Sequence, residues 1–144
     1  MPDTRLLEVT FMSKKGMLLV GHGSKLPYNQ ELVEKTAALI KAKNKDFIVK
    51  CGFMNINTPS IKESLAEFKK EQIDVLVVVP LFLAKGVHIE QDIPGEIGLP
   101  EGAKKGTFVL NGKSIPLVYA DPIGSDPLLA DLMVKNATAA LSHL

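Results

Sequence analysis

The sequence predicts an α/β protein with a doubly wound, mainly four-stranded parallel sheet and helices on both faces. Short apolar segments alternate along the chain with segments of helical period, which is the pattern of a parallel sheet with crossover helices. Residues 75–79 (VLVVV) show no polar alternation, as is typical of a central strand that is covered on both sides. Two pairs, Thr58-Pro59 and Asp126-Pro127, resemble an N-cap followed by proline at the first helical position.

The remaining elements follow from hydrophobic period. We expect strands at residues 18–20, 47–54, 75–79 and 115–120. We expect helices at residues 28–44, after Pro59, as a short broken helix within 89–99, and as a closing helix after Asp126. The apolar stripe of the closing helix, which we expect to pack inward, consists of Leu128, Leu129, Leu132, Met133, Ala137, Ala140 and Leu141.

Segment 101–114 is rich in glycine and lysine. Asn111-Gly112 lies between short apolar runs and predicts a hairpin turn. We therefore expect a small hairpin insertion on the surface. Residues 1–16 are expected to be an N-terminal extension outside a single domain formed by residues 17–144.

Composition excludes several classes of protein. The net charge of +1 gives no support for binding to nucleic acid or an anionic membrane. The longest apolar run, residues 75–84, is far shorter than the ~20 residues that span a bilayer, and it contains Pro80. The single Cys51 excludes an internal disulfide, which fits a cytoplasmic protein.

Two histidines are the main candidates for chemistry. His22 lies in Gly21-His22-Gly23-Ser24 directly after the first strand, and His88 follows the extension of the third. The carboxyl ends of parallel strands meet at one edge, where ligands bind, so both imidazoles are expected to face one cleft. Paired imidazoles suit cobalt(II), nickel(II), zinc or iron(II). The alternative is two independent loop histidines that bond to nearby backbone; His143, near the chain end, is expected to be solvated.

Other patterns are absent or incomplete. The chain contains no HxxxH, HExxH or CxxC spacing that would indicate a closed structural zinc site. Ser24 lacks the flanking glycines of a nucleophile elbow, and no phosphate-binding glycine motif follows the first strand. Anion binding at the following helix N-terminus stays open as an alternative.

Together, several motifs in order carry a resemblance to a known family. They are GHGS at His22, GFM with Thr58-Pro59, VVPLFLAKGVH with Asp92-Ile93-Pro94, and DPIG with Asp126-Pro127. Over residues 17–144 the chain resembles the small archaeal sirohydrochlorin chelatases, the CbiX and CfbA group of class II chelatases. The resemblance implies a chelatase-like, flavodoxin-like fold and a homodimer that binds the macrocycle in its cleft.

The same resemblance implies insertion of cobalt(II) or nickel(II) into sirohydrochlorin without ATP, for cobalamin or for the nickel tetrapyrrole coenzyme of methanogenesis. The divalent metal is then a substrate, and no permanently bound cofactor is expected. His22 and His88 match the metal-binding histidines of the family, and we assign them first as ligands and second as bases. Iron insertion to give sirohaem, and a non-catalytic metal or tetrapyrrole carrier, remain alternatives.

The carboxylate-rich rim of sirohydrochlorin requires cationic and backbone N–H partners near the histidines. The candidates for substrate binding are Gly21, Gly23, Ser24, Lys25, Lys85, Gly86 and Val87. Solvated surface charge is the alternative role for each lysine. The chain differs from several members of the family at Asn55, where they carry a glutamate. An asparagine cannot accept protons as a carboxylate does, so the histidines become the main candidates for that role.

Overall fold

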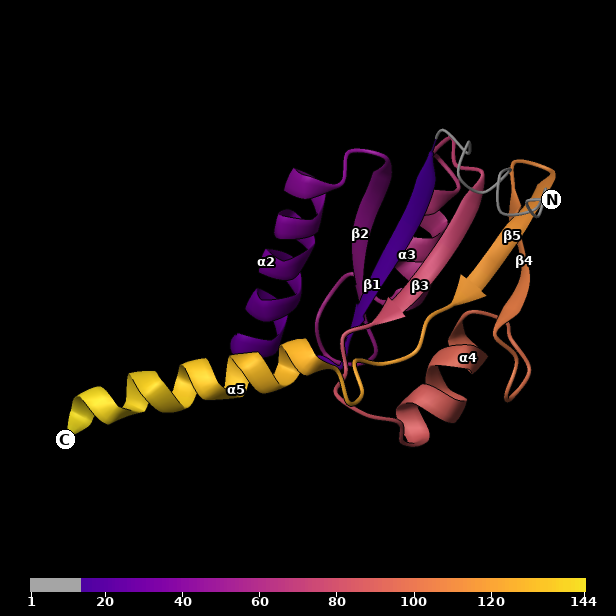
Figure 1. The fold of residues 1–144 in the computed structure, drawn as a ribbon. Helices are drawn as coiled ribbons and strands as arrows, with labels where there is room; N and C mark the ends of the chain where they lie inside the picture. Colours follow the sequence, from indigo (N-terminus) through magenta and orange to yellow (C-terminus); the bar gives the residue numbers. More distant parts are fainter. Residues whose placement is uncertain (1–13) are drawn as a thin grey trace, which may run out of the picture.

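The structure is a computed structural model, and it describes residues 14–144. A five-stranded sheet forms the centre, in the order β2-β1-β3-β5-β4 (Figure 1). The neighbours β2-β1, β1-β3 and β3-β5 are parallel, and β4 is antiparallel to β5. The strands are β1 (Lys15–Gly21), β2 (Phe47–Phe53), β3 (Val75–Pro80), β4 (Lys105–Leu110) and β5 (Lys113–Tyr119). The α/β fold with four parallel strands is therefore as expected, with one antiparallel strand added.

The helical elements of residues 14–144 are α2 (Tyr28–Lys43), α3 (Ile61–Phe68), the π-helical turn η1 (His88–Asp92), α4 (Ile93–Glu96), α5 (Pro127–Ala140) and the terminal turn η2 (Leu141–His143). Those from α2 to α4 cover both faces of the sheet. On one face, Val33 and Ala37 of α2 pack against Leu19 and Val49. On the other face, a larger apolar cluster joins the sheet to α3, η1 and α4. The sheet is thus a rigid platform whose carboxyl edge carries the loops after β1, β2 and β3.

Segment 101–114 is not a surface insertion. Asn111 and Gly112 form the expected turn with φ angles of 49° and 78°, the positive values that a tight hairpin requires. The strand before the turn joins the main sheet, because Phe108 and Leu110 point inward and are buried. The sequence signal for the turn is local, whereas the burial of β4 depends on contacts with the neighbouring helix and sheet.

The two expected helix caps had different outcomes. Asp126 caps α5 as expected and accepts a hydrogen bond from the Leu128 N–H at 2.8 Å. The cap of α3 is Ser60, not Thr58: its hydroxyl accepts from the Glu63 N–H, and the Glu63 carboxylate accepts from the Ser60 N–H. This reciprocal capping box sets the start of α3 after the cis Thr58–Pro59 bond.

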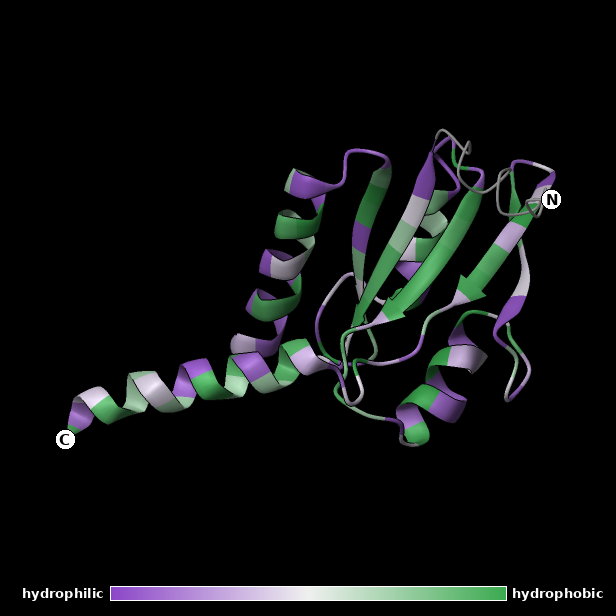
Figure 2. Cartoon of the chain, viewed as in Figure 1, coloured by the Kyte–Doolittle hydropathy of each residue, from purple (hydrophilic) through white to green (hydrophobic). Residues whose placement is uncertain are grey.

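Helix α5 does not close the domain. It extends away from the sheet (Figure 1), and none of its residues is buried in the described part of the chain. Leu128 is 71% exposed, and Leu132, Met133 and Val134 are exposed as well. Figure 2 shows apolar residues along the whole projecting helix. The expected inward packing of its stripe is therefore wrong for the single chain, since hydropathy predicts burial without saying against what.

The N-terminal extension lies almost entirely outside the described residues. Lys15 and Gly16, which the sequence analysis placed in it, already belong to β1. Within residues 14–144, no helix has both the length and the apolar character needed to cross a membrane.

Candidate metal site at the carboxyl edge of the sheet

His22 is held by the loop directly after β1, and the chain's own packing requires the two glycines beside it. A Cβ at Gly21 would lie 2.6 Å from Val33 Cγ2. Gly23 has φ +89°, and a Cβ there would overlap the carbonyl oxygen of Asn55. These glycines were expected to bind substrate; in the structure they also allow the loops after β1 and β2 to pack closely.

A network of side-chain amides fixes the same loop. The Gly23 N–H donates to Asn29 Oδ1 at 2.9 Å, and the Ser24 N–H donates to Asn57 Oδ1 at 2.8 Å. Asn57 in turn donates to Gln30 Oε1 at 3.1 Å. These backbone donors are occupied, so the loop does not offer them to a phosphate. Asn29 and Asn57 were not predicted, because isolated amides between motifs carry no sequence signal.

His88 is the first residue of η1, and buried groups anchor this turn to the sheet. Ile89 is 1% exposed, and the Tyr119 hydroxyl donates to the Ile89 carbonyl oxygen at 2.9 Å. Burial, with a smaller contribution from nearby carboxylates, raises the pKa of Tyr119 to about 12, so its hydroxyl remains a donor at neutral pH. A π turn inserts one residue into a helix and is frequent at functional sites.

The two imidazoles lie side by side. His22 Nε2 and His88 Nε2 are 3.2 Å apart, and the rings meet edge to face at 70°. His22 Nδ1 lies 3.0 Å from the Gly23 carbonyl oxygen, and His88 Nδ1 lies 2.7 Å from Asp92 Oδ2. Because a carbonyl and a carboxylate only accept hydrogen bonds, each Nδ1 carries the proton. With each Nδ1 engaged by an acceptor, the two Nε2 atoms face each other.

This geometry suits a divalent cation. With metal–nitrogen bonds of about 2.0–2.1 Å, the 3.2 Å separation corresponds to a nitrogen–metal–nitrogen angle of about 100°, between octahedral and tetrahedral values. Two facing lone pairs repel each other unless a cation or a proton lies between them. Within residues 14–144, no group of three or more His, Cys, Asp or Glu side chains is placed to hold a metal. The pair thus leaves most coordination positions open, as a site that releases its metal requires.

A shallow hollow of about 240 Å³ adjoins His88. It is lined by Met54, Asn55, His88, Asp92 and Glu96. Asn55, the departure noted in the sequence, therefore lies beside the candidate metal site. Its backbone N–H donates to the His22 carbonyl oxygen at 3.2 Å, which ties the loop after β2 to the loop after β1.

The other predicted site residues lie around the two histidines. Lys25 and Lys85 are exposed on the two flanking loops, as are Gly86 and Val87. The ring centroid of Phe82 lies 6.2 Å from that of His22 and 6.4 Å from that of His88, so it forms an apolar wall beside both. Ser24 Oγ accepts from the Leu26 N–H at 3.2 Å, a local turn contact.

His143 is exposed in η2 and lies beyond the projecting α5, as its expected solvation suggests.

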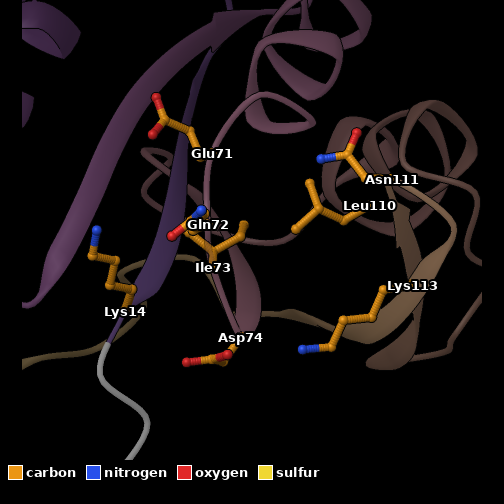
Figure 3. A pocket seen from close by; sticks show the side chains of 8 residues that line it. All are labelled: Lys14, Glu71, Gln72, Ile73, Asp74, Leu110, Asn111 and Lys113. Carbon is orange, nitrogen blue, oxygen red and sulfur yellow. The ribbon is translucent and has the colours of Figure 1, made fainter.

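A larger hollow, of about 450 Å³, lies at the opposite end of the strands (Figure 3). Its side chains come from the chain before β1, the segment before β3 and the β4–β5 turn. They are Lys14, Glu71, Gln72, Ile73, Asp74, Leu110, Asn111 and Lys113. Neither histidine lines it, and α/β sheets bind ligands at the carboxyl edge. The smaller hollow beside His88 is therefore the relevant one.

A mainly parallel α/β sheet with two imidazoles converging at its carboxyl edge defines an α/β protein with a candidate metal site. The CbiX family model matches residues 16–140. The chain therefore belongs to the CbiX family.

Its relatives agree with this assignment. The chain is 47% identical over 130 residues to a sirohydrochlorin cobaltochelatase of Methanosarcina acetivorans, covering 89% of this chain and 98% of that protein. It is 44% identical over 128 residues to the sirohydrochlorin cobaltochelatase of Methanosarcina barkeri, with the same shares covered. Among solved structures, the sirohydrochlorin chelatase SirB from Bacillus subtilis in complex with cobalt matches with TM-score 0.65 and 28% identity. That match covers 78% of this chain and 45% of SirB, so this chain spans about half of SirB.

Proposed function

We propose that the protein inserts cobalt(II) or nickel(II) into sirohydrochlorin without ATP. The observation that carries the proposal is the convergence of His22 Nε2 and His88 Nε2 at 3.2 Å, with both Nδ1 atoms engaged by acceptors. The names of the relatives support cobalt. Nickel rests on the resemblance and on the chemistry of imidazole, which binds both ions.

The two histidines act as ligands first. Each Nε2 donates its lone pair to the metal substrate, and the unfilled positions admit the pyrrole nitrogens of the macrocycle. Metal insertion exchanges one M²⁺ for two pyrrole protons. When the metal passes to the macrocycle, each imidazole regains a free lone pair, so the pair can accept the two protons. Neutral imidazole suits both roles near neutral pH.

The exposed lysines on the flanking loops supply charge for the macrocycle rim. Lys25 follows the His22 loop and Lys85 precedes His88, so both lie beside the metal pair. Carboxylates of sirohydrochlorin would bind their ammonium groups, and the planar ring would contact Phe82 and Val87. This arrangement is part of the proposal and explains why these loops expose apolar and cationic side chains together.

A homodimer follows from the exposed α5. Val77, Val79 and Val118, on the sheet face that α2 shares, are only partly buried, and α5 points away from them (Figure 1). A hollow of about 420 Å³ with a mainly apolar lining lies at the start of α5. SirB is about twice as long as this chain. We therefore infer that a second copy packs against α5, in a cytoplasmic dimer that replaces the second half of the longer protein.

Turnover tests the function. Catalytic amounts of protein are mixed anaerobically with excess sirohydrochlorin and cobalt(II), nickel(II) or iron(II), and metal insertion is followed in the visible spectrum. The proposal predicts many turnovers with cobalt or nickel, and loss of most of the rate in His22→Ala and in His88→Ala while circular dichroism is unchanged. Stoichiometric binding without turnover would favour a carrier, and preferential turnover of iron would favour sirohaem synthesis.

Light scattering after size-exclusion chromatography tests the dimer. Leu132→Glu, on the apolar surface of α5, is expected to give a monomer. Thr138→Glu adds the same charge to the same helix on the side opposite Leu132 and is expected to remain dimeric. A wild-type monomer at micromolar concentration would contradict the inference.

A further inference from the structure

We propose that Asp92 is a positioning residue, which fixes the tautomer and the orientation of His88 so that Nε2 faces the metal. The proposal rests on the proposed function only in taking His88 as a ligand. Asp92 meets His88 at Nδ1, the ring nitrogen that does not face His22.

The contact is short and has a defined direction. His88 Nδ1 lies 2.7 Å from Asp92 Oδ2, within the range of a charge-assisted hydrogen bond. An ionised carboxylate has no proton to donate, so the ring nitrogen must carry it. The proton at Nδ1 leaves Nε2 unprotonated, and this is the atom that lies 3.2 Å from His22 Nε2.

The backbone holds this pair in register. His88 and Asp92 are the first and last residues of η1, four positions apart, and therefore share one side of the turn. The Ile93 N–H donates to the His88 carbonyl oxygen, which closes the π turn. Buried Ile89 and Ile93 fix the turn against the core, so the carboxylate meets the imidazole without reorganisation of the backbone.

His22 has a different partner for the same purpose. Its Nδ1 faces a backbone carbonyl, Gly23 O, at 3.0 Å. No side-chain substitution removes that acceptor, whereas the acceptor of His88 is removed by changing Asp92. Loss of a partner that orients a metal-binding histidine typically costs 10–100-fold in metal affinity or activity.

The test compares three variants without sirohydrochlorin. Asp92→Ala removes the acceptor, Asp92→Asn keeps an acceptor oxygen but removes the charge, and Asp46→Ala is the control. Asp46 has the same side chain as Asp92 and a similar exposure, 52% against 45%, and it pairs with Lys15 at 3.0 Å at the opposite end of the sheet. Cobalt(II) affinity is measured by optical titration. We expect Asp92→Ala to bind cobalt about 10–100-fold more weakly, Asp92→Asn to be intermediate, and Asp46→Ala to match wild type.

A spectroscopic readout separates positioning from a purely structural role. Two-bond proton–nitrogen correlation spectra of the metal-free protein report which ring nitrogen of each histidine is protonated. We expect His88 in the Nδ1–H form in wild type, a mixture of tautomers in Asp92→Ala, and recovery of the Nδ1–H form in Asp92→Asn. An Nε2–H tautomer of His88 in wild type, or equal cobalt affinities for Asp92→Ala and Asp46→Ala, would overturn the proposal. Neither measurement involves turnover, so failure of the proposed function gives a different result.

Discussion

Replacement of Gly23 by alanine is the perturbation that best separates the two explanations for the glycines beside His22. If the glycine only makes room for a macrocycle, Gly23→Ala folds with wild-type stability and fails at macrocycle binding. If the packing of the chain's own loops requires it, the variant loses stability before any ligand is added. The structure favours the second explanation, since a Cβ at this position would overlap Asn55 O.

The expected magnitude has two parts. At φ +89° an alanine experiences left-handed backbone strain of roughly 1–2 kcal/mol. The overlap with the Asn55 carbonyl forces the loops after β1 and β2 apart, and such overpacking typically costs about 1–3 kcal/mol. We therefore expect a loss of about 2–5 kcal/mol in the free energy of unfolding, with weakening of the hydrogen bond from the Asn55 N–H to His22 O.

Urea unfolding followed by circular dichroism measures this loss. The matched control is Gly86→Ala on the loop before His88, where a Cβ meets nothing within 4 Å and φ is not positive. The control is expected to stay within about 0.5 kcal/mol of wild type, as surface substitutions do. A Gly23→Ala protein as stable as Gly86→Ala would refute the packing explanation and leave ligand approach as the reason for the glycine.

Four further predictions concern Tyr119, Ser60 and Phe108. Tyr119→Phe leaves the Ile89 carbonyl without its donor and should cost about 1–3 kcal/mol with weaker cobalt binding; unchanged stability and affinity would contradict the anchoring role. The pKa of Tyr119 is about 12 in the folded protein and roughly 10 in the unfolded chain. Its contribution to stability is therefore complete below about pH 10 and is lost as the pH rises through 12. Ultraviolet absorbance gives the ionisation of Tyr119, and unfolding curves at the same pH values give the loss of stability. Ser60→Ala should lower stability by about 1 kcal/mol without changing cobalt affinity; a loss of affinity would show that the cap acts on the site. Phe108→Ala should cost about 3–5 kcal/mol, whereas Val109→Ala, 55% exposed on the same strand, should be nearly neutral; equal effects would show that β4 does not belong to the core.

Much of the fold could be predicted from the sequence because its signals are local. The β-branched run of β3, the helical period of α2 and the Asn111-Gly112 turn each depend on a few neighbouring residues. The burial of β4 and the exposure of α5 could not be predicted, because both depend on tertiary contacts with residues that are distant in the sequence. A stripe of apolar residues indicates that a helix needs a partner, but not whether that partner is its own sheet.

Part of the site could also be predicted from the sequence. His22 and His88 each follow a strand that was expected to be parallel, and parallel topology brings both to one edge of the sheet. The four-residue spacing of His88 and Asp92 was visible as well, but its meaning required the helical turn that joins them. Tyr119 gave no signal, because it meets Ile89 only through the three-dimensional packing of β5 against η1.

In the proposed function, the Nε2 atoms of His22 and His88 hold the metal substrate between them. Anomalous diffraction at the cobalt edge, on crystals of the protein loaded with cobalt(II), locates the ion directly. We expect one cobalt ion at about 2.0–2.1 Å from both Nε2 atoms, with Nδ1 of His88 still bonded to Asp92. Cobalt bound through Nδ1, through one histidine alone, or at another place on residues 14–144 would contradict it.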